Sequence, residues 1–151
     1  MKKRCPWAET NDDMRVYHDT EWGVPRYNDK VIFEYILLDS FQAGLSWAII
    51  LNKRKNFRKA FDGFDPKKIA KYDKRKIASL LKDAGIVRNR AKIEATISNA
   101  KIFITIQKEF GTFSKYLWGM MGAGKPLDRA RGKQNKWRKL EDIPATSKEG
   151  D

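Results

Sequence analysis

A long run of apolar residues at helical spacing occupies residues 89–110 of the chain. Ile93, Ile97 and Ala100 follow one another at intervals of three or four residues, so they share one face of an α-helix. The pattern predicts a long amphipathic α-helix, and Gly111 is expected to end it.

Other helix boundaries are indicated by capping residues. Asn28 or Asp29, Asp65 and Asp73 are side chains that suit a helix N-cap, and Pro66 fits the first turn of the helix after Asp65. No β-hairpin, internal repeat or phosphate-binding loop is evident, so we predict an all-α fold in one domain over residues 1–151. The other expected helices lie at about 12–19, 29–38, 45–61, 74–84 and 112–121, with another beginning at Pro66. Residues 122–151 are expected to form a loop-rich tail.

Charge restricts the class of partner. The 151 residues include 32 Lys and Arg against 19 Asp and Glu, which gives a net charge of +13. Such an excess favours a polyanion, with nucleic acid first and an anionic membrane surface second. No run approaches the roughly 20 apolar residues needed to span a bilayer, and the N-terminus lacks the apolar region of a signal peptide. A single Cys excludes an internal disulfide framework, and we expect a cytoplasmic protein.

The stretch 37–51 is apolar on both flanks but carries a carboxylate, a glycine turn and a large aromatic residue. We expect Asp39 to be buried, and a buried carboxylate must be paired, cap a helix or serve a site. Trp47 supplies a π-face that can stack on a base or on a cation. A helix cap with a core tryptophan and a functional site are both compatible with these residues. The basic segment 53–59 is read as a solvated helix face.

Residues 80–93 join two expected helices through a short turn that contains glycine. Gly85 fits a helix C-terminus that needs positive φ. The next helix would start at Asn89 with free N–H groups, which bind phosphate readily, and Arg88, Arg90 and Lys92 surround that end. The pattern is similar to a helix-hairpin-helix, which grips the DNA backbone, but an ordinary corner between two helices is the alternative.

Cys5 and His18 are suitable zinc ligands, but a structural zinc site needs four. The sequence contains no other Cys or His. A structural role for both residues is the alternative to metal binding.

Four motifs together resemble one known family. They are RCPW (residues 4–7), YHDTEWGVP (17–25), QAGLSW (42–47) and AGIVRNRAKI (84–93). In this order and spacing, over about residues 4–120, they resemble the bacterial 3-methyladenine DNA glycosylase I family of helix-hairpin-helix glycosylases.

That resemblance implies a monofunctional DNA-repair enzyme that flips an alkylated purine out of double-stranded DNA and hydrolyses its N-glycosidic bond. It implies stacking surfaces at Tyr17 and Trp47, a carboxylate facing the base at Asp39, and pocket walls at Trp7 and Trp22. Leu45 would enter the space that the base leaves. Phosphate contacts would come from Gly85, Arg88, Arg90 and Lys92.

The resemblance also implies a structural zinc ion, for which Cys5 and His18 would be two of the four ligands. In the family the other two ligands come from a C-terminal segment beyond the point where this chain ends, so we expect the chain to lack that segment. The full-length form is expected to be a monomer. This chain departs from the family pattern by having Asp39 in place of glutamate and Phe41 in place of glutamine, so the identity of the excised base is open.

Three functions remain to be compared. The first is excision of 3-methyladenine or a similar cationic purine. The second is a non-catalytic helix-hairpin-helix module that binds DNA, and the third is a basic helical scaffold for protein partners. Asp39, Tyr17 and Trp47 discriminate among them, because a mere binder needs no carboxylate beside aromatic residues.

Overall fold

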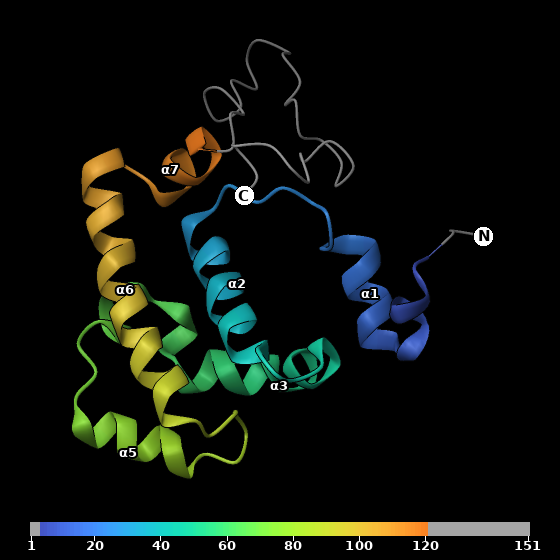
Figure 1. The fold of residues 1–151 in the computed structure, drawn as a ribbon, viewed down its shortest axis with the longest axis horizontal. Coiled ribbons are helices and arrows are strands. Elements are labelled where there is room, and N and C mark those ends of the chain that lie inside the picture. The colour runs from blue at the N-terminus through green and yellow to red at the C-terminus, as the bar shows by residue number, and fades with distance from the viewer. Residues whose placement is uncertain (1–3, 121–151) are drawn as a thin grey trace.

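The computed structural model describes residues 4–120, and this part of the chain is built from helices and turns with no β-strand (Figure 1). The all-α prediction is confirmed. The expected tail at 122–151 lies outside the described residues. In chain order the elements are the 3-10 helix η1 (Pro6–Thr10), α1 (Asp12–Thr20), α2 (Asp29–Gln42), α3 (Trp47–Ala60), the 3-10 turn η2 (Asp62–Phe64), α4 (Pro66–Ile69), α5 (Lys74–Lys82), α6 (Arg90–Phe110) and α7 (Phe113–Met120).

The helix starts follow from local capping. Asn28, Asp65, Asp73 and Asn89 each accept a hydrogen bond from a backbone N–H in the turn that follows. Such a bond satisfies one of the N–H groups that a helix leaves without a partner at its start. The caps predicted at Asp65 and Asp73 are confirmed, Asn28 is the cap of the pair Asn28 and Asp29, and the helix predicted to start at Asn89 has that residue as its cap. The 3-10 helix η1 was not expected from the sequence.

Asp29 links the start of α2 to the start of α7. Its carboxylate accepts hydrogen bonds from the backbone N–H groups of Phe113 and Ser114, each at 2.9 Å. It also accepts one from the side-chain amide of Gln107 at 2.7 Å. Asn28 therefore caps α2, and Asp29 caps the start of α7 instead.

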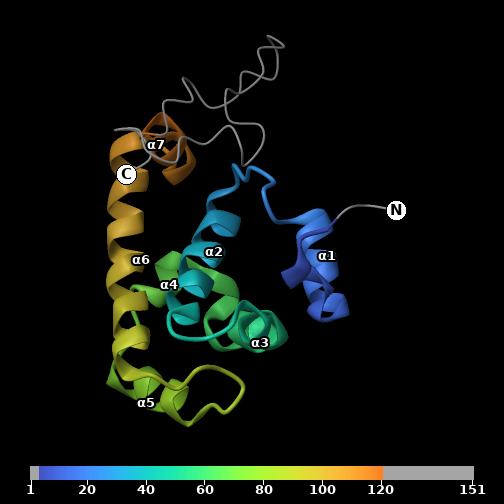
Figure 2. The ribbon, with the colours of Figure 1, turned by 45° about the vertical axis from the view of Figure 1, so that its right-hand side comes forward.

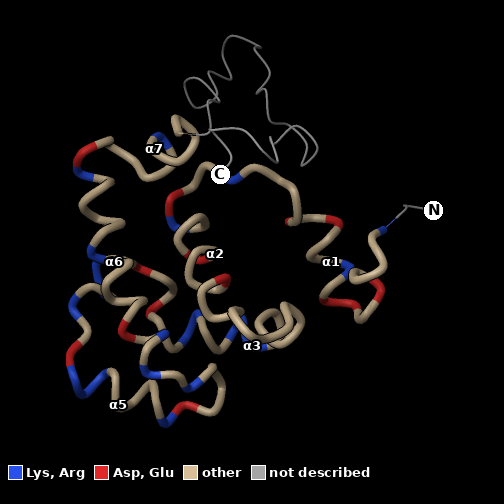
Figure 3. Tube along the Cα trace, viewed as in Figure 1, with Lys and Arg blue, Asp and Glu red and all other residues tan. Residues whose placement is uncertain are grey.

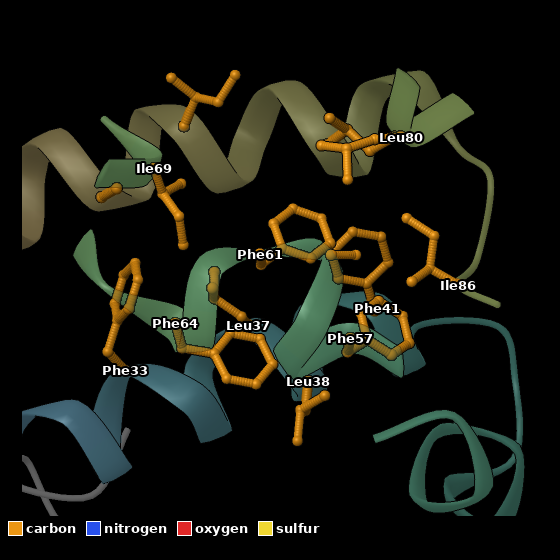
Figure 4. Packing of buried hydrophobic residues seen from close by; sticks show 14 of the residues in the cluster. Phe33, Leu37, Leu38, Phe41, Phe57, Phe61, Phe64, Ile69, Leu80 and Ile86 are labelled. Atoms are coloured by element: carbon orange, nitrogen blue, oxygen red, sulfur yellow. The ribbon is translucent and has the colours of Figure 1, made fainter. Parts of the chain in front are cut away.

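The hydrophobic core is dominated by phenylalanine and lies among α2, α3, α4, α5 and α6 (Figure 4). Phe41 of α2 packs on Phe57 of α3 with ring centroids 4.8 Å apart. Phe33 of α2 packs on Phe103 of α6 at 4.7 Å. These pairs fix α2 between α3 and α6, because aromatic rings bury large areas in specific geometries.

Residues 4–22, which comprise η1, α1 and the turn after it, are called the N-terminal unit. Figures 1 and 2 both show α1 to one side of α2 and α3, joined to α2 by an extended segment. The core cluster contains no residue that precedes Phe33. The buried apolar residues of the unit are Ala8 and Met14. Its position is therefore set by contacts other than the main core.

Charge is unevenly distributed along the described chain. Figure 3 shows Lys and Arg recurring along α3 and α5, while the segment that joins α5 to α6 carries Asp83 and Arg88. Neither α3 nor α5 contains an Asp or Glu, whereas the N-terminal unit has more acidic than basic residues. The basic side of the molecule thus includes the expected hairpin. None of the described helices is both long and apolar enough to cross a membrane.

Candidate functional site

A cavity of about 460 Å³ lies between the N-terminal unit and the start of α3. Four aromatic side chains line it: Trp7 from η1, Tyr17 from α1, Trp22 from the turn after α1, and Trp47, the first residue of α3. The structure thus brings together the four aromatic residues that we predicted to surround a base. The smaller lining residues are Thr10, Met14, Ser46 and Ala48.

Local structure places these rings. The Asn11 side chain caps α1 by accepting from the N–H of Met14 at 2.9 Å, and Ser46 caps α3 directly before Trp47. The rings of Tyr17 and Trp47 lie 5.4 Å apart with their planes inclined by 54°. This spacing admits no flat molecule between them. A base in the cavity would therefore contact their outer faces.

Asp39 differs from our expectation. It was predicted to be buried, but its side chain is exposed and lies within α2 rather than at a helix cap. The reason is helical periodicity: Leu37, Leu38 and Phe41 face the core, which turns Asp39 outward. Among the described residues its carboxylate has no hydrogen-bond or ion-pair partner.

Asp39 is not among the residues that line the cavity, but its carboxylate lies close enough to Tyr17 to act on that phenol. Burial raises the pKa of the Tyr17 phenol, and the negative charge of Asp39 raises it further. Neighbouring protein atoms also desolvate the carboxyl group of Asp39 and raise its own pKa. An unpaired negative charge thus faces a residue that lines the aromatic cavity.

The indole N–H of Trp47 is buried without a hydrogen-bond partner in the described part of the chain. A buried donor left unpaired costs about 1–3 kcal/mol. Trp47 also packs against the core, so its ring is held in place while its donor is unused. Tryptophan in this position combines a core contact with a free polar group beside the cavity.

An ionic network that includes Arg54 lies next to the cavity. The prediction of a solvated face holds for Lys55, Arg58 and Lys59, which are exposed, and is wrong for Arg54. Arg54 of α3 is 14% exposed and binds two carboxylates. Its Nε donates to Glu34 of α2 at 2.6 Å, and its Nη1 donates to Glu21 of the N-terminal unit at 2.9 Å. Arg58 also donates to Glu34, at 2.7 Å. The Tyr35 hydroxyl donates to Glu21.

Sequence reasoning missed this network, although one signal was present. Glu34 stands inside the apolar run of α2, and a charge in such a run needs a partner when it is buried. The partner itself could not be identified, because Glu34 and Arg54 are 20 residues apart on different helices.

The predicted hairpin is present between α5 and α6. Its turn is stabilised by Asp83, whose side chain accepts from the N–H of Gly85 at 2.7 Å. Lys53 of α3 donates to the carbonyl of Ala84 at 3.0 Å and so ties the turn to α3. Arg88 and Arg90 are exposed at the start of α6, where phosphate-binding cations were expected.

Gly85 is required for a reason other than the predicted one. It does not have the positive φ that we expected of a helix C-terminus. A Cβ at this position would lie 3.1 Å from side-chain carbons of Asn56 and 2.9 Å from Oδ1 of Asp83. Close approach of the turn to α3 therefore explains the glycine.

Two further predicted DNA contacts have structural partners. The ammonium of Lys92 donates to the carbonyls of Phe41 and Ala43, at 2.8 and 2.6 Å, at the end of α2. Leu45 is half-buried and packs against the core, and its carbonyl accepts from the Gln42 amide at 2.7 Å. Both side chains are partly exposed and have contacts within the protein, and their contacts with DNA stay predictions.

Cys5 and His18 are adjacent in the structure. The backbone N–H of Cys5 lies 3.4 Å from Nε2 of His18, and Nδ1 of His18 lies 3.1 Å from Asp19. The imidazole stacks on Trp22 with centroids 5.2 Å apart. Within residues 4–120, however, no three His, Cys, Asp or Glu side chains are grouped to hold a metal ion. The zinc ion implied by the resemblance therefore stays a prediction, with Cys5 and His18 as two candidate ligands.

The comparison with known proteins agrees with this geometry. The methyladenine glycosylase family model matches residues 7–151. A DNA-3-methyladenine glycosylase of Haemophilus influenzae is 42% identical over 121 residues, which cover 80% of this chain and 65% of that protein. DNA-3-methyladenine glycosylase 1 of Escherichia coli is 40% identical over 119 residues, which cover 79% of this chain and 64% of that protein. The chain therefore spans just under two thirds of the length of these relatives.

Solved structures are similar as well. A crystal structure of 3-methyladenine DNA glycosylase I has a TM-score of 0.78 at 36% identity, and the match covers 97% of this chain and 77% of that one. A 3-methyladenine DNA glycosylase I from Staphylococcus aureus has a TM-score of 0.76 at 36% identity, covering 82% of this chain and 65% of that one. Fold, motifs and identity lead to the same conclusion: this chain belongs to the methyladenine glycosylase family.

Proposed function

We propose that the protein is a DNA glycosylase that releases 3-methyladenine from double-stranded DNA. The observation that carries the proposal is the cavity of about 460 Å³ lined by four aromatic rings, with the unpaired carboxylate of Asp39 near one of them. A small-molecule site of this size and apolar lining suits a purine. A similar solved structure of a 3-methyladenine DNA glycosylase I contains 3-methyladenine.

Charge gives the proposed site its preference for a methylated, cationic base over a neutral one. Methylation at N3 makes the adenine base cationic, and an aromatic face over a desolvated cation contributes up to about 2 kcal/mol. Tyr17 and Trp47 supply such faces, and the negative charge of Asp39 favours the cationic base over a neutral one. Normal adenine is also harder to unstack and extrude from the duplex, which adds to the selectivity.

The cationic base is already a good leaving group. Water adds to C1′ of the sugar, the bond from C1′ to N9 breaks, and its electron pair neutralises the base. The water molecule loses one proton to solvent, and the products are 3-methyladenine and an abasic site. The residues of the chain bind and orient the base, and no protonated side chain is required to make it leave.

DNA would be held on the basic side of the molecule. The helix N-terminus at Asn89 and the exposed guanidinium groups of Arg88 and Arg90 suit phosphate oxygens, which fix the register on the duplex without reading sequence. The net charge of +13 supports such binding. We propose no zinc-dependent step, since Cys5 and His18 supply two ligands at most. A monomeric state and a cytoplasmic location remain predictions.

Free-base release from methylated duplex DNA, resolved by chromatography, tests the proposal. Release of 3-methyladenine by the wild-type chain would support the enzyme. Release of a different purine would keep the chemistry and change the substrate. Retained DNA binding with no release from a folded protein would favour the non-catalytic DNA-binding module instead.

A further inference from the structure

We infer that Arg54 is a positioning residue: by binding Glu21 it fixes the N-terminal unit against α3 and sets the separation between the two walls of the aromatic cavity. This inference rests on the proposed function, because the cavity is the proposed base site. Arg54 itself does not line that cavity.

The two walls belong to parts of the molecule that the hydrophobic core does not join. Trp7, Tyr17 and Trp22 are all in the N-terminal unit, which contributes nothing to the core cluster. Trp47 is on α3 and packs against that cluster. The segment from residue 23 to 28, which connects the unit to α2, contains no helix. The Tyr17 and Trp47 rings contact each other across the two walls, at 5.4 Å between centroids, and polar contacts add to this aromatic contact in holding the walls in register.

Glu21 is rigidly connected to the Tyr17 wall. The backbone N–H groups of Glu21 and Trp22 both donate to the carbonyl of Tyr17, at 2.8 and 2.9 Å. The Glu21 side chain accepts from Nη1 of Arg54 through both carboxylate oxygens, at 3.0 and 2.9 Å. Arg54 follows Trp47 by seven residues, which is about two turns along the same face of α3. A short series of contacts thus connects one wall to the other.

Arg54 is itself held by α2, so it can act as a fixed point. Its Nε donates to Glu34, which is 7% exposed, at 2.6 Å, and its guanidinium lies 5.3 Å from the centroid of the Tyr35 ring. A planar guanidinium can bind one carboxylate through Nε and another through Nη, whereas the ammonium of lysine is a single point charge. The arrangement at this position therefore depends on arginine.

Arg58 provides a matched control. It is one turn further along α3 and binds the same Glu34, but the structure shows no contact between it and Glu21. Arg54→Met and Arg58→Met therefore each remove a charge from one network, and only the first removes the link to the N-terminal unit. Glu21→Gln removes the carboxylate from the other end of that link while keeping its shape.

The test compares the dissociation constant of free 3-methyladenine with that of undamaged duplex DNA. Hydrogen bonds to charged groups contribute about 1.5–3 kcal/mol, so Arg54→Met should weaken base binding by roughly 10- to 100-fold. Arg58→Met should change it by less than about threefold, and Arg54→Lys should give partial rescue. Undamaged-DNA binding should change little in all three. Arg54→Met should have a smaller effect in the Glu21→Gln background than in the wild type, because the two substitutions weaken the same contact.

Hydrogen–deuterium exchange supplies a readout that does not depend on function. A nine-residue helix such as α1 is unstable without tertiary contacts. Amides in 12–20 should therefore exchange faster in Arg54→Met and in Glu21→Gln than in Arg58→Met, while those of α6 stay protected. If Arg54→Met does not fold, Glu21→Gln tests the same contact.

Three results would overturn the inference: unchanged base binding with unchanged exchange in α1, an equal effect of Arg58→Met, or additive effects of Arg54→Met and Glu21→Gln. If the wild-type protein binds no 3-methyladenine, the proposed function fails. The exchange comparison then still decides whether Arg54 positions the N-terminal unit.

Discussion

Replacing Lys92 with Met removes the ammonium that joins the first turn of α6 to the last residues of α2. The ammonium donates to the carbonyls of Phe41 and Ala43 at 2.8 and 2.6 Å. A hydrogen bond from a charged donor contributes about 1.5–3 kcal/mol, and a cation at a helix C-terminus about 0.3–1 kcal/mol. Ala43 is exposed, so water replaces its bond in the variant. The methionine side chain is not held by hydrogen bonds, so up to about 2 kcal/mol of side-chain conformational entropy is recovered. We expect a net loss of about 1–2 kcal/mol.

Thermal unfolding measures this loss. For a domain of this size 1 kcal/mol corresponds to roughly 2–4 °C, so Lys92→Met should lower Tm by about 2–8 °C. Lys101→Met is the control, because Lys101 is on the same helix, is exposed, and has no side-chain partner among the described residues. This variant should unfold within about 1 °C of the wild type, as surface substitutions usually do.

DNA binding distinguishes the two roles considered for Lys92. A phosphate ligand contributes about one unit to the slope of log K against log salt concentration. Arg88→Ala should reduce that slope by about one unit, and Lys92→Met should leave it close to that of Lys101→Met. If Lys92→Met reduces the slope by about one unit and unfolds at the same Tm as Lys101→Met, the structural role is refuted. Lys92 is then a phosphate ligand.

Other perturbations follow from the same structure. Asp39→Asn should lower excision of the cationic base far more than DNA binding, and an equal loss of both would contradict the proposed role of Asp39. The stability of this variant should be unchanged or slightly raised, because burial raises the pKa of the unpaired Asp39 carboxyl. Gly85→Ala should cost about 1–3 kcal/mol in chemical denaturation, since the new Cβ would lie 3.1 Å from Asn56. Burial alone would raise the pKa of Glu21, but hydrogen bonds from a tyrosine hydroxyl and from Arg54 lower it. The stabilisation by Glu21 is therefore present above its ordinary pKa of 4.5 and is lost as the pH falls below that value. The difference in unfolding free energy between the wild type and Glu21→Gln should accordingly shrink toward pH 3.

The helices could be predicted because their boundaries are set by adjacent residues. Asp65, Asp73 and Asn89 cap the helices that directly follow them, so residue type and position carried the information. Asp29 was an equally plausible cap by type, but it caps α7, which lies 84 residues further along the chain. Capping across such a distance depends on which helix ends meet in the fold, and residue patterns do not contain that information.

In the candidate site, the aromatic residues could be predicted and their polar neighbours could not. From the residues alone, Asp39 and Trp47 were compatible with a helix cap and a core position; the family resemblance singled out the aromatic residues that the structure places around one cavity. The polar partners could not be predicted. Arg54 looked like one of several basic residues on a solvated face, and its burial depends on Glu21 and Glu34, which come from two other elements.

The contact between Asp29 and α7 imposes an order on folding. Asn28 caps α2 without help from any distant residue, so the N-terminus of α2 does not depend on α7. By contrast, the first two amides of α7 depend on Asp29, and Thr112 satisfies only the amide of Lys115. At roughly 5–20 residues per second, α7 leaves the ribosome several seconds after Asp29. When α7 forms, its capping carboxylate is therefore already present in the chain, and the docking of α7 joins the last described helix back to α2.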